Sequence, residues 1–374
     1  MGVQNIRQEK VLRWIDTNNI RKNKALISII IPIYQVSDYV ERCIRSVMIQ
    51  TFTDIECIIV DDATEDDSID KCERLIKEYN DNLNDNLDVR GGIRFKILHH
   101  EVNRGLSAAR NTGTKAATGE YVFYLDSDDE ITSDCMEKMM LMAVKYPEAE
   151  MVVGNYMECR EGVKAKVMHG EDLPVVIKSN DEYARYYHQH RIAHSAWNKL
   201  IKRSFIEKHG LYFTEGILYE DFMWMFHVAK YVSFVCVVKD VTYHYCIRPG
   251  SITMDSDEKK VGDSYIVIYD DILNHLTRGK EKAELIYCVE RFCKHYLTYK
   301  DTMTMYKSLH SLFTERAREF GCWYAYIVLT AVAVMGKMGN PMKLLSALHA
   351  VRWKITPYLY KVSGSVKKKT KRFF

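Results

Sequence analysis

The sequence predicts an α/β protein with a mixed, mostly parallel central sheet and a helical C-terminal region. Residues 26–33 (LISIIIPI) form an almost unbroken apolar, β-branched run, which is typical of a strand buried on both faces of a parallel sheet. Strand-like and helix-like patterns then alternate to about residue 130, as they do in βαβ units. With 374 residues, 47% of them hydrophobic, the chain is long enough for two or three globular units.

The first part of the chain is predicted element by element from hydrophobic periodicity. The expected elements are further strands at 55–60, 95–98 and 121–125, and helices that begin near Asp38 and Ile69 and cover 106–118. Residues 79–92 are rich in Asn and Asp and predict a surface loop.

The pattern becomes mixed beyond about residue 150. The expected elements are a strand at 151–155, a helix at 180–190, a turn and helix at 197–210, strands within 232–245, and helices from 256 onward. We therefore divide the chain into an N-terminal segment, two halves of one α/β domain, and a helical, basic C-terminal region. Their ranges are 1–24, 25–130, 131–253 and 254–374.

Two predicted strands end directly in acid clusters, Asp61-Asp62 and Asp126-Ser127-Asp128. Ligands bind beyond the carboxyl ends of parallel strands, so we expect both clusters to face one crevice. The pair Asp126 and Asp128 suits Mg²⁺ or Mn²⁺, which binds carboxylates together with phosphate oxygens and water. A solvated acidic turn is the alternative. Asp61 and Asp62 could accept hydrogen bonds from a ribose or a base, or could belong to an ordinary polar loop.

A helix with small residues opens at residues 103–111 (NRGLSAARN). Small residues allow the backbone to approach a ligand or the sheet closely. Arg104 or Arg110 could therefore face a diphosphate. The alternative is close helix–sheet packing with solvated arginines, and for Arg110 this alternative is at least as good.

These segments, in this order, resemble the inverting glycosyltransferases of family 2, of the bacterial surface-polysaccharide type, which have the GT-A fold. The resemblance covers about residues 25–250. It rests on ISIIIPIYQVSDYVERCIRSVMIQTF, IECIIVDDATEDDS, NRGLSAARNTGTKAATGEYVFYLDSDD, WNKL, YED and YHYCIRPGSIT. Residues 63–66 (ATED) depart from the Gly-Ser-Thr-Asp turn that is frequent in the family.

The resemblance implies a nucleotide-sugar donor with UDP as its carrier. By this resemblance Pro32, Tyr34 and Asp62 hold the nucleoside, and we expect Asp61 and Arg104 in the same donor site. The family's D-x-D pair corresponds to Asp126 and Asp128, with Asp128 as the direct ligand of a Mg²⁺ or Mn²⁺ on the diphosphate.

Two further segments carry expected site residues. Inverting transfer needs a carboxylate base that takes the proton of the acceptor hydroxyl. The resemblance assigns this role to Asp221, with Glu220 shaping its environment, whereas a helix N-cap is the alternative. Arg248 is expected to contact phosphate from a loop that closes over the diphosphate. His244 could complete the metal site, although a strand histidine bonded to the backbone is the commoner case.

Trp197 lies in the expected acceptor region, where it could stack on a sugar, but a packed core tryptophan is favoured.

Charge is distributed unevenly along the chain. The total of 53 Lys and Arg against 50 Asp and Glu conceals a stretch, 320–374, with ten basic and no acidic residues. An acidic body with a basic tail argues against a general nucleic-acid binder. The apolar run 323–336 is too short to span a bilayer, and together with the basic tail it favours attachment to an anionic membrane surface. A packed helical hairpin with a solvated tail is the alternative.

The ten cysteines include no C-x-x-C pair, and the N-terminus has no apolar signal region. We therefore expect a cytoplasmic protein without disulfides, peripheral on the inner face of the plasma membrane. The predicted function is metal-dependent transfer of a sugar to a saccharide or lipid-linked acceptor. A catalytically silent nucleotide-sugar-binding module or a membrane scaffold on the same fold is the alternative, which the intact D-x-D and Glu-Asp pairs disfavour. A nucleotidyltransferase would need a Gly- and Arg/Lys-rich loop where residues 32–36 read PIYQV.

Overall fold

In the computed structural model the chain divides into two units, residues 1–255 and residues 256–374, and each is considered by itself. The structure describes residues 26–85, 92–160, 163–168, 173–189, 191–248, 250–251, 257–276, 285–292 and 303–322, together with positions 325 and 329.

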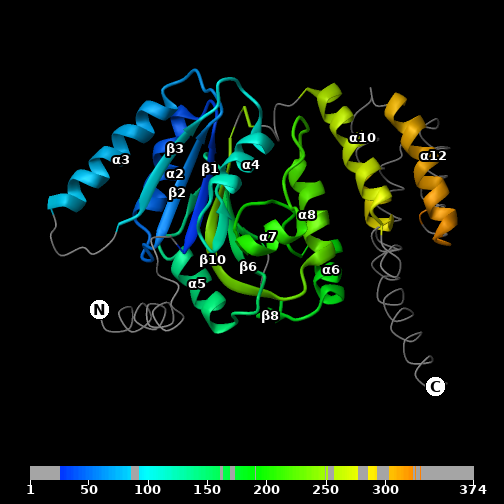
Figure 1. The fold of residues 1–374 in the computed structure, drawn as a ribbon. Helices are drawn as coiled ribbons and strands as arrows, with labels where there is room; N and C mark the ends of the chain where they lie inside the picture. The colour runs from blue at the N-terminus through cyan, green and yellow to red at the C-terminus, as the bar shows by residue number, and fades with distance from the viewer. Residues whose placement is uncertain are drawn as a thin grey trace. The chain divides into compact units, whose positions relative to one another are not determined.

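One mixed sheet runs through the first unit (Figure 1). Its described strands follow the order β3 (Arg94–His99), β2 (Ile55–Asp61), β1 (Ile27–Ile33), β4 (Tyr121–Tyr124), β9 (Lys199–Lys202), β6 (Met151–Arg160), β10 (Val235–Ile247) and β5 (Glu130–Ile131). In addition, β7 (Val163–Met168) pairs with β6, and β8 (Val176–Ile177) pairs with β10. Strands β3, β2, β1 and β4 are parallel, whereas β9 is antiparallel to both neighbours. The carboxyl ends of the parallel strands therefore lie along one edge of the sheet.

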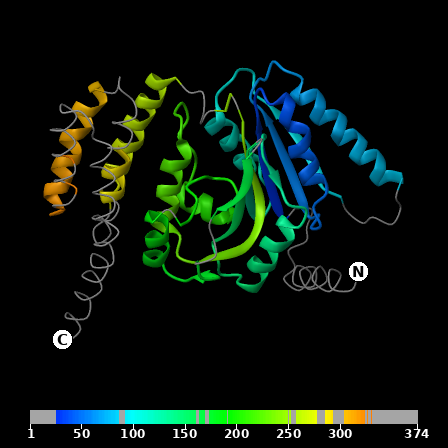
Figure 2. The ribbon, with the colours of Figure 1, turned by 180° about the vertical axis from the view of Figure 1, so that it is seen from behind.

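Helices cover both faces of this sheet, as the opposite views of Figures 1 and 2 show. On one face lie α2 (Ser37–Met48), α3 (Ser68–Asp85) and α5 (Cys135–Lys145), and on the other α4 (Leu106–Ala116), α6 (Asn180–His188), α7 (Arg203–His209) and α8 (Glu220–Tyr231). Ile29 and Ile31 of β1 pack with the first group, and Ile30 packs with the second. Successive side chains of a strand point to opposite faces, which explains why β1 is apolar at almost every position.

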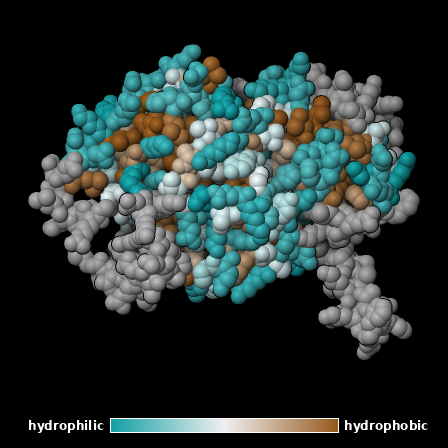
Figure 3. All heavy atoms as spheres, in the orientation of Figure 1, coloured by the Kyte–Doolittle hydropathy of each residue, from teal (hydrophilic) through white to brown (hydrophobic). Residues whose placement is uncertain are grey.

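Helix α3 is longer than predicted. It continues to Asp85, so the prediction that a loop begins at residue 79 is wrong. The reason is packing: the ring of Tyr79 meets Phe95 of β3 edge-on at 5.5 Å, and its hydroxyl accepts the N–H of Ile93 at 3.1 Å. Asn80, Asp81 and Asn82 are exposed on this helix, and Figure 3 shows hydrophilic side chains along the outer border of this part of the molecule.

Strand β9 was predicted as part of a turn and helix, and this prediction is also wrong. Lys199–Lys202 is a buried strand between β4 and β6, and the helix that follows covers only Arg203–His209. A run of four residues is too short for its periodicity to identify a strand. Its long-range pairing decides its conformation.

The second unit is helical where it is described. It contains α10 (Glu258–Asn274), a helical stretch at residues 285–292, and α12 (Met303–Glu319). Tyr269, Phe292 and Phe313 bring one ring from each stretch into contact, with centroids 4.8–5.8 Å apart. No described helix has the length and apolar character needed to cross a membrane. The N-terminal segment, the basic tail and most of the apolar run at 323–336 lie outside the described residues.

Candidate active site

The predicted nucleotide residues gather at the carboxyl ends of β1 and β2. Pro32 is buried in β1 beside Val60 of β2, and Tyr34 follows the strand with 41% of its surface exposed. Strand β1 also pairs in parallel with β4, which leads directly to Asp126. The structure therefore places both predicted clusters at one edge of the sheet, where ligands bind in open α/β sheets.

Asp62 is turned towards the protein. Its carboxylate accepts the backbone N–H groups of Arg104 at 2.9 Å and Gly105 at 2.7 Å, and lies 2.6 Å from Nδ1 of His100. Only 3% of its surface is exposed. Its carboxylate therefore fixes the loop that leads into α4.

Asp61 is less enclosed than its neighbour. It accepts the N–H of Thr64 at 2.9 Å and lies 2.9 Å from Nδ1 of His99. These contacts hold a turn in which Ala63 has a positive φ of 56°, a conformation that glycine adopts more readily. The departure from the family's Gly-containing turn falls at this residue.

Arg110 of α4 joins the two predicted catalytic motifs. Its Nη1 donates to Glu220 Oε1 and to Asp221 Oδ1, each at 2.6 Å, and its Nη2 donates to Asp126 Oδ1 at 2.7 Å. The guanidinium also lies 5.2 Å from the centre of the Phe213 ring, and the side chain is only 1% exposed. Burial alone would lower the pKa of Arg110, but the surrounding carboxylates raise it. Arg110 is thus a buried bridge between carboxylates, and the alternative of a solvated arginine is wrong.

The three carboxyl groups exceed the charge of this one guanidinium. Burial raises the pKa of Glu220 to about 8, and the neighbouring Asp221 contributes to the rise. Burial also raises the pKa of Asp126 to about 6, where Arg110 opposes the shift and the carboxylates of Asp221 and Asp128 reinforce it. Proton uptake or an added cation would relieve the excess negative charge.

Asp126 and Asp128 fit a hard divalent cation. Their side chains are 23% and 21% exposed, and Arg248 Nε donates to Asp128 Oδ2 at 2.7 Å. Within the described part of the chain, Oδ2 of Asp126 and Oδ1 of Asp128 accept no protein hydrogen bond. Each residue therefore offers one carboxylate oxygen, the donor type that Mg²⁺ and Mn²⁺ prefer, beside an excess of negative charge.

Strand β10 anchors the segment that follows. Asp129 is buried and accepts the Tyr243 hydroxyl and the Cys246 N–H, both at 2.7 Å. Tyr243 and Tyr245 both stack on Trp197, so His244 between them points to the opposite face of β10. The strand thus directs His244 away from the face on which Tyr243 reaches Asp129.

Glu220 and Asp221 are the first residues of α8, but Asp221 does not cap that helix. The N-cap position is Tyr219, with a positive φ of 59° and no side-chain capping bond. The Asp221 carboxylate instead points to Arg110 and, through Oδ2, accepts the N–H of Ala196 at 2.9 Å. Its side chain remains 22% exposed, so a substrate can reach it.

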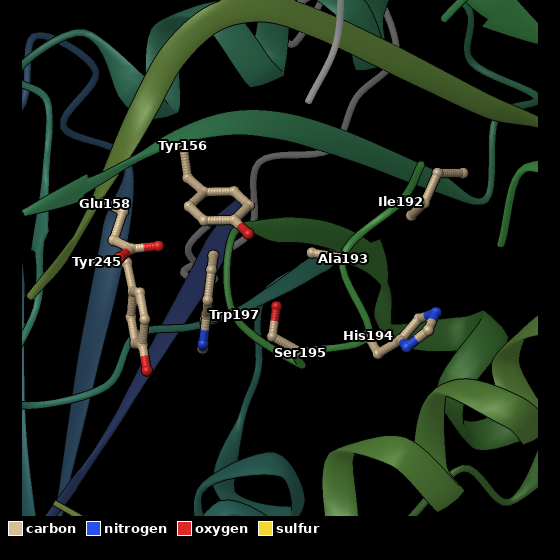
Figure 4. A pocket seen from close by; sticks show the side chains of 8 residues that line it. All are labelled: Tyr156, Glu158, Ile192, Ala193, His194, Ser195, Trp197 and Tyr245. Atoms are coloured by element: carbon tan, nitrogen blue, oxygen red, sulfur yellow. The ribbon is translucent and has the colours of Figure 1, made fainter. Parts of the chain in front are cut away.

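A pocket of about 340 Å³ adjoins the segment that holds Asp221 (Figure 4). It is lined by Tyr156, Glu158, Ile192, Ala193, His194, Ser195, Trp197 and Tyr245. Trp197 is 7% exposed and is a packed tryptophan, as the sequence favoured, with one part of its ring at the pocket wall.

Lys199 binds the backbone of two residues that line this pocket. Its buried Nζ donates to the carbonyl oxygens of Ser195 at 2.6 Å and Trp197 at 3.4 Å. Burial lowers the pKa of Lys199 to about 7, although the nearby Asp221 opposes the shift. Lys199 belongs to the WNKL segment that carries the family resemblance, but the sequence, in which Lys202 and Arg203 follow closely, does not reveal that this lysine is the buried one.

Fold and site together define a glycosyltransferase. The chain matches the family described as glycosyl transferase family 2 over residues 28–210. It is 33% identical to EpsH of Bacillus subtilis (strain 168), a provisionally named glycosyltransferase, over 65% of this chain and 67% of EpsH. It is 32% identical to glycosyltransferase GlyA of Streptococcus pneumoniae, over 62% of this chain but only 32% of GlyA. The chain belongs to glycosyltransferase family 2.

Solved structures support the same fold. The crystal structure of S. aureus TarS 1-349 in complex with UDP-GlcNAc aligns with a TM-score of 0.63 at 16% identity, covering 82% of this chain and 87% of that one. The GT-A fold and the family membership predicted from the sequence are therefore confirmed.

Proposed function

We propose that the protein is a metal-dependent, inverting glycosyltransferase that moves a sugar from a UDP-linked donor to a saccharide or lipid-linked acceptor in polysaccharide synthesis. One observation carries this proposal: Arg110 binds Asp126 of the D-x-D pair and Asp221 of the Glu-Asp pair at 2.7 and 2.6 Å. Donor-side and acceptor-side carboxylates thus belong to one cluster. UDP as the carrier is supported by the UDP-GlcNAc bound to the TarS structure of the same fold.

On the donor side, Pro32, Tyr34 and Asp61 border the nucleoside, with Arg104 and the Asp62-supported loop beside them. Asp126 and Asp128 would hold Mg²⁺ or Mn²⁺, whose charge stabilises the leaving diphosphate when the ion is bound. Arg248 provides a further positive charge beside Asp128.

On the acceptor side, Asp221 accepts the proton of the acceptor hydroxyl while the hydroxyl oxygen attacks the anomeric carbon. The bond from that carbon to the UDP oxygen breaks on the opposite side, so the configuration inverts. Burial raises the pKa of Glu220, so that proton uptake by Glu220 would reduce the negative charge next to the base.

Substitution of Asp221 by Asn tests the assignment of the base. We expect Asp221→Asn to bind UDP as the wild type does, but to transfer sugar roughly 10²–10⁴-fold more slowly, because a base acts only in the chemical step. UDP release and product formation from a panel of nucleotide sugars, with Mn²⁺ or with EDTA, measure this. Asp81→Asn, at an exposed position of α3, is the matched control. Transfer by Asp221→Asn at the control rate would refute the assignment, and UDP binding by the wild type without transfer to any acceptor would favour the silent-module alternative.

We also infer a peripheral position on the inner face of the plasma membrane. The support is the basic stretch 320–374, which carries ten Lys and Arg and no acid. Each basic residue near an anionic leaflet contributes about 1 kcal/mol of attraction. A lipid-linked acceptor would give this attachment a purpose.

A further inference from the structure

We propose that Arg248 makes the binding of a divalent cation at Asp128 depend on the nucleotide, and that Tyr39 is the positioning residue that holds Arg248 in this role. Without a nucleotide, Arg248 is the counter-ion of Asp128 and weakens the attraction of that carboxylate for Mg²⁺ or Mn²⁺. This inference rests on the proposed function, because it concerns the metal and the donor of that transferase. It goes further by naming how the two ligands affect each other and which residue of α2 controls the effect.

The bond between Arg248 and Asp128 occupies one oxygen of a predicted metal ligand. Arg248 Nε donates to Asp128 Oδ2 at 2.7 Å, and the two side chains are only 16% and 21% exposed. Solvent ions therefore screen this pair less than an ion pair on the open surface. A cation held by the other oxygen of Asp128 would share the carboxylate with the guanidinium, and two positive charges at one carboxylate repel each other.

Tyr39, on the first turn of α2, contacts the Arg248 guanidinium. Arg248 Cζ lies over the Tyr39 ring, 4.7 Å from its centre, which is the geometry of a cation–π contact. One turn further along the helix, Arg42 Nη2 donates to the backbone carbonyl oxygen of Asp128 at 2.8 Å, and its Nε lies 2.9 Å from Glu130 Oε1. Glu130 offsets the charge of Arg42. Helix α2 therefore fixes the backbone of Asp128 through Arg42 and holds Arg248 against the carboxylate through Tyr39.

A diphosphate beside Asp128 changes this balance. It brings negative charge to the guanidinium and to the cation at once, and so offsets the repulsion between them. The bond to Asp128 uses one of the five N–H donors of Arg248, and a guanidinium binds phosphate as well as carboxylate. Arg248 therefore favours the state with cation and nucleotide together over the state with the cation alone. Such coupling is reciprocal, and it typically amounts to a factor of roughly 5–150.

A simple phosphate contact is the alternative role for Arg248. In that case loss of the guanidinium would weaken UDP binding by the same factor with and without Mn²⁺, and the affinity for Mn²⁺ alone would not change. The proposed role instead requires that loss of the guanidinium strengthens the binding of Mn²⁺ alone, because Asp128 then loses its counter-ion. The two roles therefore differ in the sign of a measurable affinity change.

Electron paramagnetic resonance of free Mn²⁺, on the full chain with and without saturating UDP, measures the coupling. We expect Arg248→Gln to bind Mn²⁺ alone roughly tenfold more tightly than the wild type, and the gain in Mn²⁺ affinity that UDP causes to fall by about the same factor. Arg94→Gln is the matched control and should change neither affinity, because Arg94 is exposed at the amino end of β3, away from the carboxyl ends that border the site. Asp128→Ala identifies the part of Mn²⁺ binding that belongs to this site.

Tyr39 provides a second test that leaves every charge in place. Tyr39→Leu should lower the coupling in the same direction as Arg248→Gln, whereas Tyr39→Phe, which retains the ring, should preserve it. Urea unfolding followed by circular dichroism shows whether each variant is folded. If Arg248→Gln does not fold, the comparison of Tyr39→Leu with Tyr39→Phe decides whether the contact with Arg248 sets the coupling.

A UDP titration on the same samples separates the coupling role from the proposed function. If the wild type binds Mn²⁺ and UDP without mutual effect, or if Arg248→Gln needs UDP to bind Mn²⁺ as much as the wild type does, the coupling role is overturned and the proposed function stands. Equal coupling in Tyr39→Leu and Tyr39→Phe would overturn the role of Tyr39. If UDP binds but Mn²⁺ binds under neither condition, the proposed metal dependence fails, and if UDP does not bind, the donor assignment fails first.

Discussion

Removal of the Arg110 guanidinium is the most direct test of how the site is held together. Arg110→Ala leaves Asp126, Glu220 and Asp221 without the donor that all three share. A hydrogen bond to a charged group contributes roughly 1.5–3 kcal/mol, so three such bonds set an upper range of about 5–9 kcal/mol. The stranded carboxylates can bind protons or water, which reduces the loss towards the roughly 3–5 kcal/mol typical of a broken buried ion pair.

Urea unfolding of the full chain, followed by circular dichroism, measures this loss. The matched control is Arg74→Ala, because Arg74 pairs with Glu41 on the surface, with 56% and 37% of the two side chains exposed. An exposed pair contributes about 0–1 kcal/mol. Arg110→Lys should fall between wild type and Arg110→Ala, since an ammonium lacks the planar fork of the guanidinium. A loss for Arg110→Ala no greater than that of the Arg74 control would refute the bridging role.

Three further outcomes are expected. Asp128→Ala should lose the Mn²⁺-dependent part of its affinity for UDP in isothermal titration, and an unchanged dependence would remove Asp128 from the metal site. Glu220 holds in the folded state a proton that it releases in the unfolded chain, because burial raises its pKa to about 8. The stability of the wild type should therefore fall relative to Glu220→Gln as the pH rises from about 5 to about 8, and parallel urea midpoints across that range would contradict this. In liposome co-sedimentation, the full chain should bind anionic vesicles at low salt and lose binding at high salt or on deletion of residues 320–374, whereas binding indifferent to the deletion would support the packed hairpin.

The parallel part of the fold is readable in the sequence because its strands are buried on both faces. Ile27–Ile33 and Ile55–Asp61 are mostly apolar runs, and the acids at the end of the second run and after Tyr121–Tyr124 mark the edge of the sheet. The predicted end of helix α3 and the prediction for strand β9 are wrong for a different reason. Their conformations depend on partners far along the chain, such as Phe95 for Tyr79 and the two neighbouring strands for Lys199–Lys202.

The same distinction applies to the site. Asp126, Asp128 and Asp221 could be selected from local motifs, and the structure brings Asp126 and Asp221 to one guanidinium. That Arg110 provides this guanidinium could not be foreseen, because it meets Asp221 across more than a hundred residues of sequence. Likewise, no local pattern reveals that the Asp62 carboxylate is engaged by the amides that open α4.

The hydrogen bond from Ala196 to Asp221 has a consequence for which residues around the pocket can be exchanged. One stretch of backbone both borders the pocket and binds the carboxylate proposed as the base, and Lys199 binds the carbonyl oxygens on either side of Ala196. Exchanging this loop for one from a relative would therefore change the pocket wall and the position of Asp221 together. Glu158 and Tyr245 stand on β6 and β10 instead, where a side chain can change while the backbone of the loop stays in place. Libraries that aim to redirect the enzyme should therefore vary the strand positions and leave the loop intact.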